Sequence, residues 1–494
     1  MDTRRVVDPL GERLIPKDAY FGIQTFRATE NFPVSGIKES PQFIKAYVLV
    51  KKAAATANMQ VGWLDKNIGK AIVLACDEVL SGKLLDQFVV DVFQAGAGTS
   101  FNMNVNEVIA NRAVERAGGI IGSKHPVHPH DHVNLSQSTN DVFPTAMHLS
   151  AAMGIQGRLI PGIRKLKNGF DQKAEQWSGI VKIGRTHLQD ALPLTLGQEF
   201  SGYAAMLGDN LVRLEEVLTQ LYSTAIGGTA VGTGFGALQG FAQGVCKHLA
   251  AMTGMPFQTA ANKFAVMGAH DALVMASGTL KTLACSLYKM ANDIRLLGSG
   301  PRCGLHELAL PANEPGSSMM PGKCNPTQCE SLAMVAVQVM GYDAAVAFAG
   351  AGGHLEMNAY KPLIIYNIIK SISLLSDGCE RFNDYLLMGL EPDRKRIEYF
   401  LDRSLMLVTA LIPVIGYDKA AEIARLAQGV VAPHVLALGR WSLALALMAC
   451  ALALIQSQHR SRTYFVELER LKKQAHVLEE QWGQLQLEQS TWAN

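Results

Sequence analysis

The sequence lacks several patterns that would place it in a specialised class. No CxxC or CxxxH pair occurs among its eight cysteines, so the common cysteine-based metal sites are not expected. A formal net charge of +2 over 494 residues gives no electrostatic reason to expect nucleic acid or an acidic partner. Residues 1–18 carry charges and no apolar run, so we expect no signal peptide and a cytoplasmic catalytic part.

Long helices with one apolar face dominate the middle of the sequence. Hydrophobic residues make up 48% of the chain, and apolar residues recur at spacings of three and four, as expected for a buried helix face. Helices of this length bury their apolar faces best against one another, so we expect a helix bundle in a mainly α fold. The expected long helices span 147–177, 198–224, 267–297 and 327–349.

The N-terminal region is less regular. Residues 1–45 are interrupted by Pro and Gly, whereas 43–82 show helical periodicity. Small polar residues at 94–106 predict a loop that leads into a helix near Asn106. His, Pro, Asn and Ser residues predict a second loop over 123–145.

The character of the chain changes after about residue 427. Residues 441–455 form an uncharged apolar run, whose length is borderline between a buried helix and a membrane span. From Tyr464 to Leu485, seven apolar or aromatic residues alternate spacings of four and three. This regular seam favours a coiled coil over a single amphipathic helix packed on the body.

One loop carries residues suited to chemistry. The segment 316–326 reads GSSMMPGKCNP and places two hydroxyls, a Lys and an Asn between Gly and Pro residues. A solvated loop is the simplest interpretation, since Gly, Ser and Pro are common in loops. A phosphate-binding loop needs Ser or Thr after its Lys, and here Cys324 follows Lys323, which argues against that interpretation.

This segment resembles the signature GSSxMPxKxN of the aspartase/fumarase superfamily. Three further segments resemble the superfamily's substrate segments: TSFNMN at 99–104, STND at 138–141 and GRTHLQD at 184–190. The resemblance runs over about 8–427 and implies a mainly α fold, with a long central helix bundle and a mixed N-terminal domain. It also implies a homotetramer in which each site draws on three subunits, a small dicarboxylate substrate, and no cofactor or metal.

The resemblance implies a fumarate-forming elimination. Removing the proton next to a carboxylate produces a doubly charged aci-carboxylate, which needs hydrogen-bond donors and a cation in fixed positions. Ser317 would be the general base, His187 would pair with Glu330 near the leaving group, and Lys323 would supply the cation. The substrate-binding residues would be Thr99, Ser100, Asn102, Ser138, Thr139, Asn140, Thr186, Lys323 and Asn325.

The sequence segments point to two different substrates. The segments 95–100 (AGAGTS) and 138–140 (STN) look like those of aspartate ammonia-lyases, whereas 325–330 (NPTQCE) and 404–424 look like those of class II fumarases. Because the first two segments would touch the substrate, we expect conversion of L-aspartate to fumarate and ammonia. The alternatives are a class II fumarate hydratase and, in another class, an inactive lyase-like scaffold on a cell-division membrane anchor.

A histidine-rich segment follows at 128–132. Alternating imidazoles are a weak sign of a metal site, and none is expected here. Class II fumarases carry a secondary anion site in this segment, which would place His128 and Asp131 at a helix N-terminus. The sequence has His130 where fumarases have Asn.

The tail resembles the bacterial cell-division protein FtsL, a family with one membrane helix and a coiled coil. This resemblance implies a membrane tether at 435–456 and divisome partners. The expected parts are an N-terminal lyase domain (1–140), a central bundle (141–395), the start of a C-terminal lyase domain (396–430), a transmembrane helix (431–457) and a coiled-coil segment (458–494).

Overall fold

The computed structural model describes residues 2–428. They belong to two compact units, one made of Met1–Gln176 and Gly197–Asp393 and the other of Trp177–Leu196 and the chain from Arg394. The chain is mainly helical, which confirms the predicted fold class. The five-part division stays a prediction, and its last two parts, with the apolar run and the heptad seam, lie outside the described residues.

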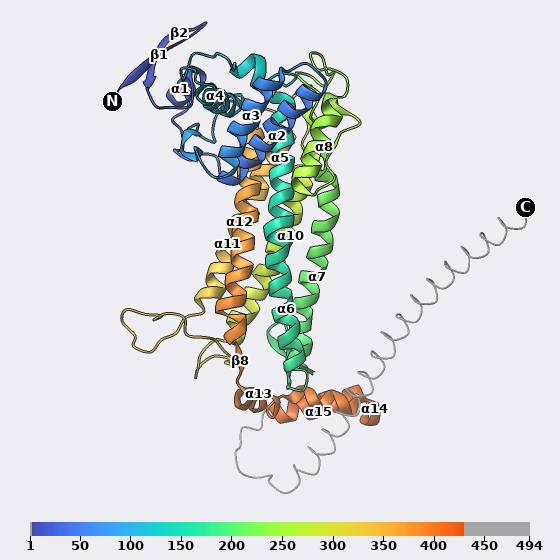
Figure 1. Ribbon diagram of the computed structural model, residues 1–494. Coiled ribbons are helices and arrows are strands. Elements are labelled where there is room, and N and C mark those ends of the chain that lie inside the picture. Colours follow the sequence, from blue (N-terminus) through green and yellow to red (C-terminus); the bar gives the residue numbers. More distant parts are fainter. Residues whose placement is uncertain (1, 429–494) are drawn as a thin grey trace, which may run out of the picture. The chain divides into compact units, whose positions relative to one another are not determined.

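The N-terminal region of the first unit combines a hairpin with helices (Figure 1). Strands β1 (Thr3–Asp8) and β2 (Gly11–Pro16) pair antiparallel. The helices that follow are α1 (Ile23–Asn31), α2 (Pro41–Gln60), α3 (Lys66–Leu80) and α4 (Thr99–Arg116), with a 3₁₀ turn η1 (Leu85–Gln87) before α4. The helical periodicity over 43–82 is thus confirmed as two helices.

Helices α4 and α5 (Thr139–Gly154) begin earlier than the sequence suggested. The prediction of a loop up to Asn106 is wrong because α4 starts after Gly98 and buries the asparagines of its first turns. The predicted loop over 123–145 contains the π-helix η2 (Pro129–Val133) and the start of α5. When the inward face of a helix carries buried polar residues, the sequence does not show the apolar periodicity by which helices are predicted.

Four aromatic rings join α2, α4 and α5. Phe43 stacks on Phe101 with centroids 5.5 Å apart and lies 5.2 Å from Phe143, while Tyr47 meets Phe101 edge to face at 5.3 Å. Gly98 has a φ of +85°, and a Cβ there would lie 2.1 Å from the Phe143 ring. Only glycine therefore lets α4 begin against α5 at this point.

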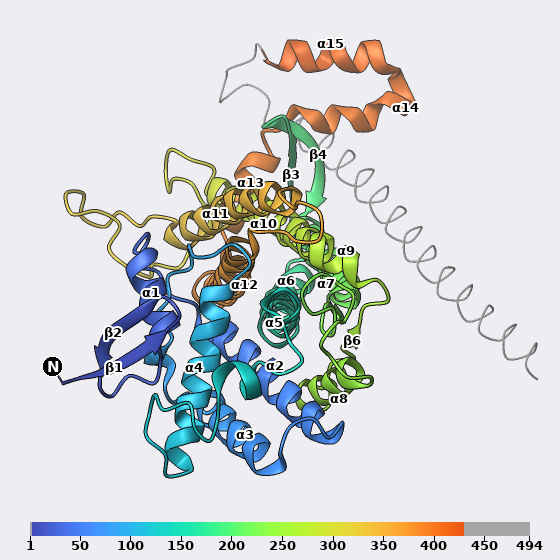
Figure 2. The same cartoon turned by 90° about the horizontal axis from the view of Figure 1, so that it is seen from above.

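The remaining long helices of the first unit form a bundle around α5, which lies near the centre of Figure 2. Helix α5 continues through the π-helix η3 (Ile155–Leu159) into α6 (Ile160–Gln176). The others are α7 (Leu196–Leu221), α8 (Phe241–Thr253), α9 (Lys263–Gly268), α10 (Asp271–Leu297), α11 (Thr327–Ala351) and α12 (Lys361–Tyr385). The four predicted long helices are confirmed within a few residues, apart from the earlier start of α5.

Helix α12 was not among the helices predicted from the sequence. Its buried Ile365, Ile368, Ile372 and Leu375 follow spacings of three and four, so the pattern carried a usable signal. Short elements complete the unit: the pairs β5 (Ser223–Thr224) with β6 (Gln258–Thr259) and β7 (Leu308–Ala309) with β8 (Glu391–Pro392), and the turn η4 (Leu387–Gly389).

The second unit is built on an antiparallel hairpin of β3 (Val181–Thr186) and β4 (Gln189–Thr195). The helical elements are α13 (Arg394–Leu401), η5 (Leu405–Leu411), α14 (Ile412–Ile415) and α15 (Tyr417–Gln428). The guanidinium of Arg185 lies 5.3 Å from the Phe400 ring centroid, so a cation–π contact joins the hairpin to α13.

Burial of His148 in α5 predicts a specific acid sensitivity. Burial lowers the pKa of this imidazole to about 4, so between about pH 4 and 6.5 the unfolded chain binds the extra proton. Folding stability should therefore fall as pH falls through this window, by roughly 3 kcal/mol for this group. We expect His148→Gln to flatten the acid limb of the unfolding free energy, measured by denaturant titration from pH 4 to 7.

The exposed His354 supplies the matched control, because its imidazole meets solvent in both the folded and unfolded states. His354→Gln should leave the slope of stability against pH unchanged. An acid limb that is equally steep in wild type and His148→Gln would refute the assignment.

Candidate functional site

Two helix N-termini carry most of the predicted substrate-binding residues. Thr99 and Ser100 form the first turn of α4, and Thr139 and Asn140 form the first turn of α5. First-turn backbone N–H groups lack partners within their own helix, and they favour a bound anion. The N-cap of α4 is Gly98, which has no side chain to occupy the Thr99 and Ser100 N–H groups, whereas the Phe101 N–H donates to the Gln94 side chain at 2.7 Å. A carboxylate-bearing ligand suits this arrangement.

Asp141 fixes the start of α5 and was not among the predicted residues. Its carboxylate accepts a hydrogen bond from the Ser138 backbone at 2.9 Å, and Ser138 caps the helix in return. It also accepts from the backbones of Gly227 and Thr229, both at 3.0 Å. Burial raises its pKa to about 7, although these backbone donors favour the charged form. The capping-box pattern of Ser138 and Asp141 was the available signal.

A hydrogen bond joins the two helix N-termini directly. The Asn102 side-chain amide of α4 donates to the Thr139 hydroxyl of α5 at 2.9 Å, and its carbonyl accepts from Tyr47 at 3.0 Å. The Asn140 amide donates to the Ala230 carbonyl at 2.8 Å. The structure therefore brings together the predicted residues of the segments 99–104 and 138–141, and adds the loop around Ala230.

The loop 316–326 holds Ser317 in a defined environment. The Ser317 hydroxyl oxygen accepts from the backbone N–H groups of Met319 at 3.2 Å and Met320 at 3.0 Å. The Gly316 N–H donates to the Lys323 carbonyl at 2.9 Å, and the Asn325 amide donates to the Gly316 carbonyl at 2.6 Å. Two backbone donors at one oxygen would stabilise an alkoxide, which suits a serine that acts as a base.

Lys323 and Glu330 are exposed in the described chain. Glu330 lies in the first turn of α11, directly after the loop. Helix α11 has 25 residues and so extends for about 37 Å. Its far end lies beside the N-terminus of α12, where the Asn358 amide donates to Ala349 and the Lys361 N–H donates to Gly96.

Within one chain, the Ser317 loop and the α4–α5 N-termini therefore lie at opposite ends of the bundle (Figure 1). A single copy of the first unit brings the predicted residues together in two separate groups.

Thr186 and His187 belong to the second unit. They lie at the turn between β3 and β4 and are exposed. His187 and Leu188 have φ values of 55° and 59°, the left-handed pair that a tight two-residue hairpin requires. The turn thereby presents the imidazole at the tip of a hairpin.

The segment with His128 and Asp131 forms η2. The His128 ring Nδ1 accepts from the backbones of His130 and Asp131 at 3.2 Å each, and the His132 ring accepts from the His128 backbone at 2.9 Å. These two N–H groups already have an internal acceptor. The secondary anion site stays a prediction. Among residues 2–428, no group of three His, Cys, Asp or Glu side chains is arranged to hold a metal ion.

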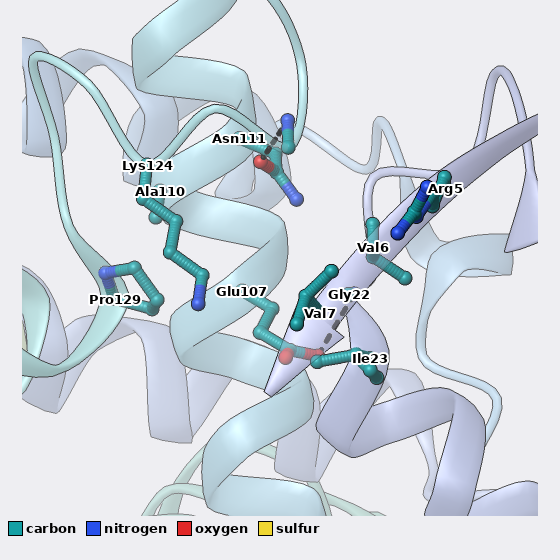
Figure 3. A pocket seen from close by; sticks show the side chains of 11 residues that line it. Arg5, Val6, Val7, Gly22, Ile23, Glu107, Ala110, Asn111, Lys124 and Pro129 are labelled. Atoms are coloured by element: carbon teal, nitrogen blue, oxygen red, sulfur yellow. Dashed lines mark hydrogen bonds between the residues drawn. The ribbon is translucent and has the colours of Figure 1, made fainter. Parts of the chain in front are cut away.

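A cavity of about 320 Å³ lies between β1, α4 and the segment around Lys124. Figure 3 shows the Lys124 amine and the Glu107 carboxylate on its walls. Glu107 accepts from the Gly22 backbone at 2.8 Å and from the Thr25 hydroxyl at 2.6 Å, so its carboxylate is already engaged in capping α1. The predicted substrate residues do not line this cavity.

Comparison with known families gives two matches. The profile of the family described as "Lyase" matches residues 11–341, and that of "Cell division protein FtsL" matches residues 428–494.

Two relatives with similar sequences are both fumarate hydratases. A class II fumarate hydratase of Thermosynechococcus vestitus is 57% identical over 424 residues, which are 86% of this chain and 91% of the relative. The mitochondrial fumarate hydratase of Homo sapiens is 54% identical over 422 residues, 85% of this chain and 82% of the relative.

Solved structures with a similar fold include a fumarase and a fumarate lyase. A class II fumarase from Schistosoma mansoni superposes with a TM-score of 0.85 at 42% identity, covering 86% of this chain and 93% of that one. A fumarate lyase:delta crystallin from Brucella melitensis gives a TM-score of 0.84 at 47% identity, with the same two coverages.

The expectation of L-aspartate as substrate is wrong, because these relatives are fumarate hydratases. It relied on Thr99-Ser100 and on Ser138-Thr139-Asn140. The exchange between Ser and Thr at position 139 keeps one hydroxyl with the same hydrogen-bonding capacity, so it says little about the leaving group. The segments 325–330 and 404–424, which pointed to fumarases, were the better guide.

Proposed function

The chain belongs to the lyase family of the aspartase/fumarase superfamily, and from this premise we propose that it catalyses the reversible hydration of fumarate to L-malate. The observation that carries the proposal is the 57% identity to a class II fumarate hydratase over 86% of the chain. The two backbone donors at the Ser317 oxygen and the first-turn N–H groups left open at Thr99, Ser100 and Thr139 support it.

In the malate-to-fumarate direction, the Ser317 alkoxide removes the proton from C3. The electron pair moves into the adjacent carboxylate to give the aci-carboxylate, whose second negative charge meets Lys323 and the first-turn donors of α4 and α5. The C2–O bond then breaks, the pair returns to form the C=C bond, and the hydroxyl leaves as water with a proton from His187. Glu330 favours the protonated imidazole.

Replacing the base gives the first test. Ser317→Ala should lower kcat for L-malate by at least about a thousandfold, because it removes the proposed base for the C3 proton, while the unfolding midpoint changes little. Turnover is measured as fumarate absorbance, with L-malate and with L-aspartate.

The adjacent Ser318 provides the control. It is exposed, and Ser318→Ala should lower kcat by no more than about tenfold, as expected for a residue outside the proton transfer. Wild-type protein that forms fumarate from neither substrate would refute the proposed function and favour the inactive-scaffold interpretation.

We also propose that the active form is a homotetramer whose sites combine segments from different subunits. The Ser317 loop and the α4–α5 N-termini lie at opposite ends of α11 within one chain. The bundle also exposes large apolar side chains along α10 and α11, among them Met275, Met334, Val337 and Phe348 at 52, 67, 55 and 84%. By its length and composition, helix α11 could cross a membrane. A helix that is buried between subunits has the same length and apolar composition.

Shared sites predict complementation between two impaired variants. Ser317→Ala lacks the base and Thr139→Val binds substrate weakly, so a mixed tetramer contains some sites in which both segments are native. At a substrate concentration well below the KM of Thr139→Val, denaturing and refolding the two variants together should give more activity than the sum of the two variants refolded separately. Mixtures no more active than their parents would place the whole site within one subunit.

For the tail, we propose that the apolar run within residues 435–456 tethers the protein to a membrane. The match to the FtsL family over 428–494 and the uncharged run over 441–455 support this. An Arg at the centre of a membrane helix costs about 2.5–3.5 kcal/mol on insertion scales. We therefore expect Leu447→Arg to move the full chain from the membrane pellet to the soluble fraction of lysed cells.

Ser457→Arg adds the same charge just outside the run and should leave the protein in the pellet. Wild-type chain found entirely in the soluble fraction would contradict the tether.

A further inference from the structure

A lysine is buried beneath the two helix N-termini of the candidate site. Lys51 of α2 has no exposed surface. Its ammonium donates to the side-chain carbonyl oxygens of Asn134 and Gln137, both at 3.0 Å. Among the described residues it forms no ion pair with a carboxylate. Burying a lysine ammonium that is held only by two neutral amides costs free energy.

The Asn134 oxygen is the centre of the surrounding network. Besides Lys51, it accepts from the amides of Asn106 at 3.0 Å and Asn102 at 3.2 Å. The Asn102 amide also donates to the Thr139 hydroxyl. A path of three hydrogen bonds therefore runs from the buried ammonium to a predicted substrate-binding residue.

Lys51 reinforces one orientation of this network. The Asn134 amide donates to the Gln137 carbonyl at 3.1 Å, and the Gln137 amide donates to two further backbone carbonyls, which favours the same orientation. An ammonium has donors and no acceptor, so both neighbouring amides must turn their oxygens toward it. If the Asn134 amide were reversed, its NH₂ group would face the NH₂ groups of Asn102 and Asn106. Reversing Asn102 in turn would point its NH₂ at the Tyr47 hydroxyl, and its carbonyl oxygen would accept the Thr139 proton. In the observed orientation Asn102 donates to Thr139, so the Thr139 proton is free for a ligand.

The local charges agree with this arrangement. Burial lowers the pKa of Lys51 to about 7, and the buried carboxylate of Asp141 acts in the opposite direction and favours the ammonium. A dicarboxylate bound at the α5 N-terminus would add negative charge on the same side and favour the ammonium further.

We propose that Lys51 is a positioning residue for the dicarboxylate: through Asn134 and Asn102 it directs the Thr139 hydroxyl proton toward the ligand. The proposal rests on the proposed function, since it assumes that the ligand is the dicarboxylate of that reaction. Lys51 itself would touch neither substrate nor reacting atoms.

The test compares kinetic constants with stability. Lys51→Met keeps the length of the side chain and removes its donors and charge. We expect KM for L-malate and fumarate to rise about tenfold, with kcat within about threefold of wild type, because substrate binding is weakened uniformly. Thr139→Val should raise KM in the wild-type background and have little further effect in Lys51→Met, because both changes break the same path.

Lys173 is the matched control. It is also buried, and its amine donates to the Leu390 carbonyl at 2.7 Å, near the opposite end of the bundle. Lys173→Met should lower the unfolding midpoint by a similar amount and leave both kinetic constants near wild type. Equal kinetic effects in the two lysine variants, or independent effects of Lys51→Met and Thr139→Val, would overturn the proposal.

Two further measurements cover the remaining outcomes. If Lys51→Met does not fold, Asn134→Leu breaks the same path from its centre and is expected to raise KM similarly; an unchanged KM would overturn the proposal. If the wild type turns over neither substrate, the proposed function fails on its own. Calorimetric binding of succinate, an unreactive dicarboxylate, then tests Lys51 directly, and a Kd equal in wild type and Lys51→Met would refute its role.

Discussion

The backbone N–H groups left open at the first turns of α4 and α5, those of Thr99, Ser100 and Thr139, are the feature on which the proposed site depends. A helix N-terminus binds an anion only while its own side chains leave these groups open, and two helices act together only if their relative position is fixed. The aromatic contacts of Phe43, Phe101 and Phe143 fix that position from the apolar side. The hydrogen bond from Asn102 to Thr139 fixes it from the polar side.

The length of the central helices has a second consequence. Helix α11 is rigid over about 37 Å, so it holds the Ser317 loop at one end and supports the α4–α5 region at the other. Such a chain cannot complete the proposed site by bending, because a packed bundle has no hinge of that size. Assembly of several copies offers the alternative, and the exposed apolar side chains of α10 and α11 provide surface for it.

The sequence allowed some of these features to be predicted, and physical reasons explain the rest. The apolar stripes of α10 and α11 and the loop 316–326 are local patterns, and they were found. The start of α4 was missed because its inward face carries Asn102, Asn104 and Asn106. Lys51 was missed because its partners are distant in sequence; Lys51 and Asn134 are 83 positions apart. Asp141 had a local signal in its capping box with Ser138, but its bonds to Gly227 and Thr229 span 86 and 88 positions. The aspartate expectation gave weight to Thr139, although Thr and Ser would donate alike at that position.

The buried charges around α5 are better explained by orientation than by stability. Removing a charge from water costs several kcal/mol, and apolar side chains of similar volume are often as stable or more so. Asp141 receives three backbone hydrogen bonds, and Lys51 gives two to side-chain oxygens. A methionine could fill the space of Lys51, but it would remove the ammonium that draws both amide oxygens to one side, and only the bonds made by the amide NH₂ groups would then hold them. What the charge supplies is a single direction for each donor, and a site that recognises two carboxylates requires that direction.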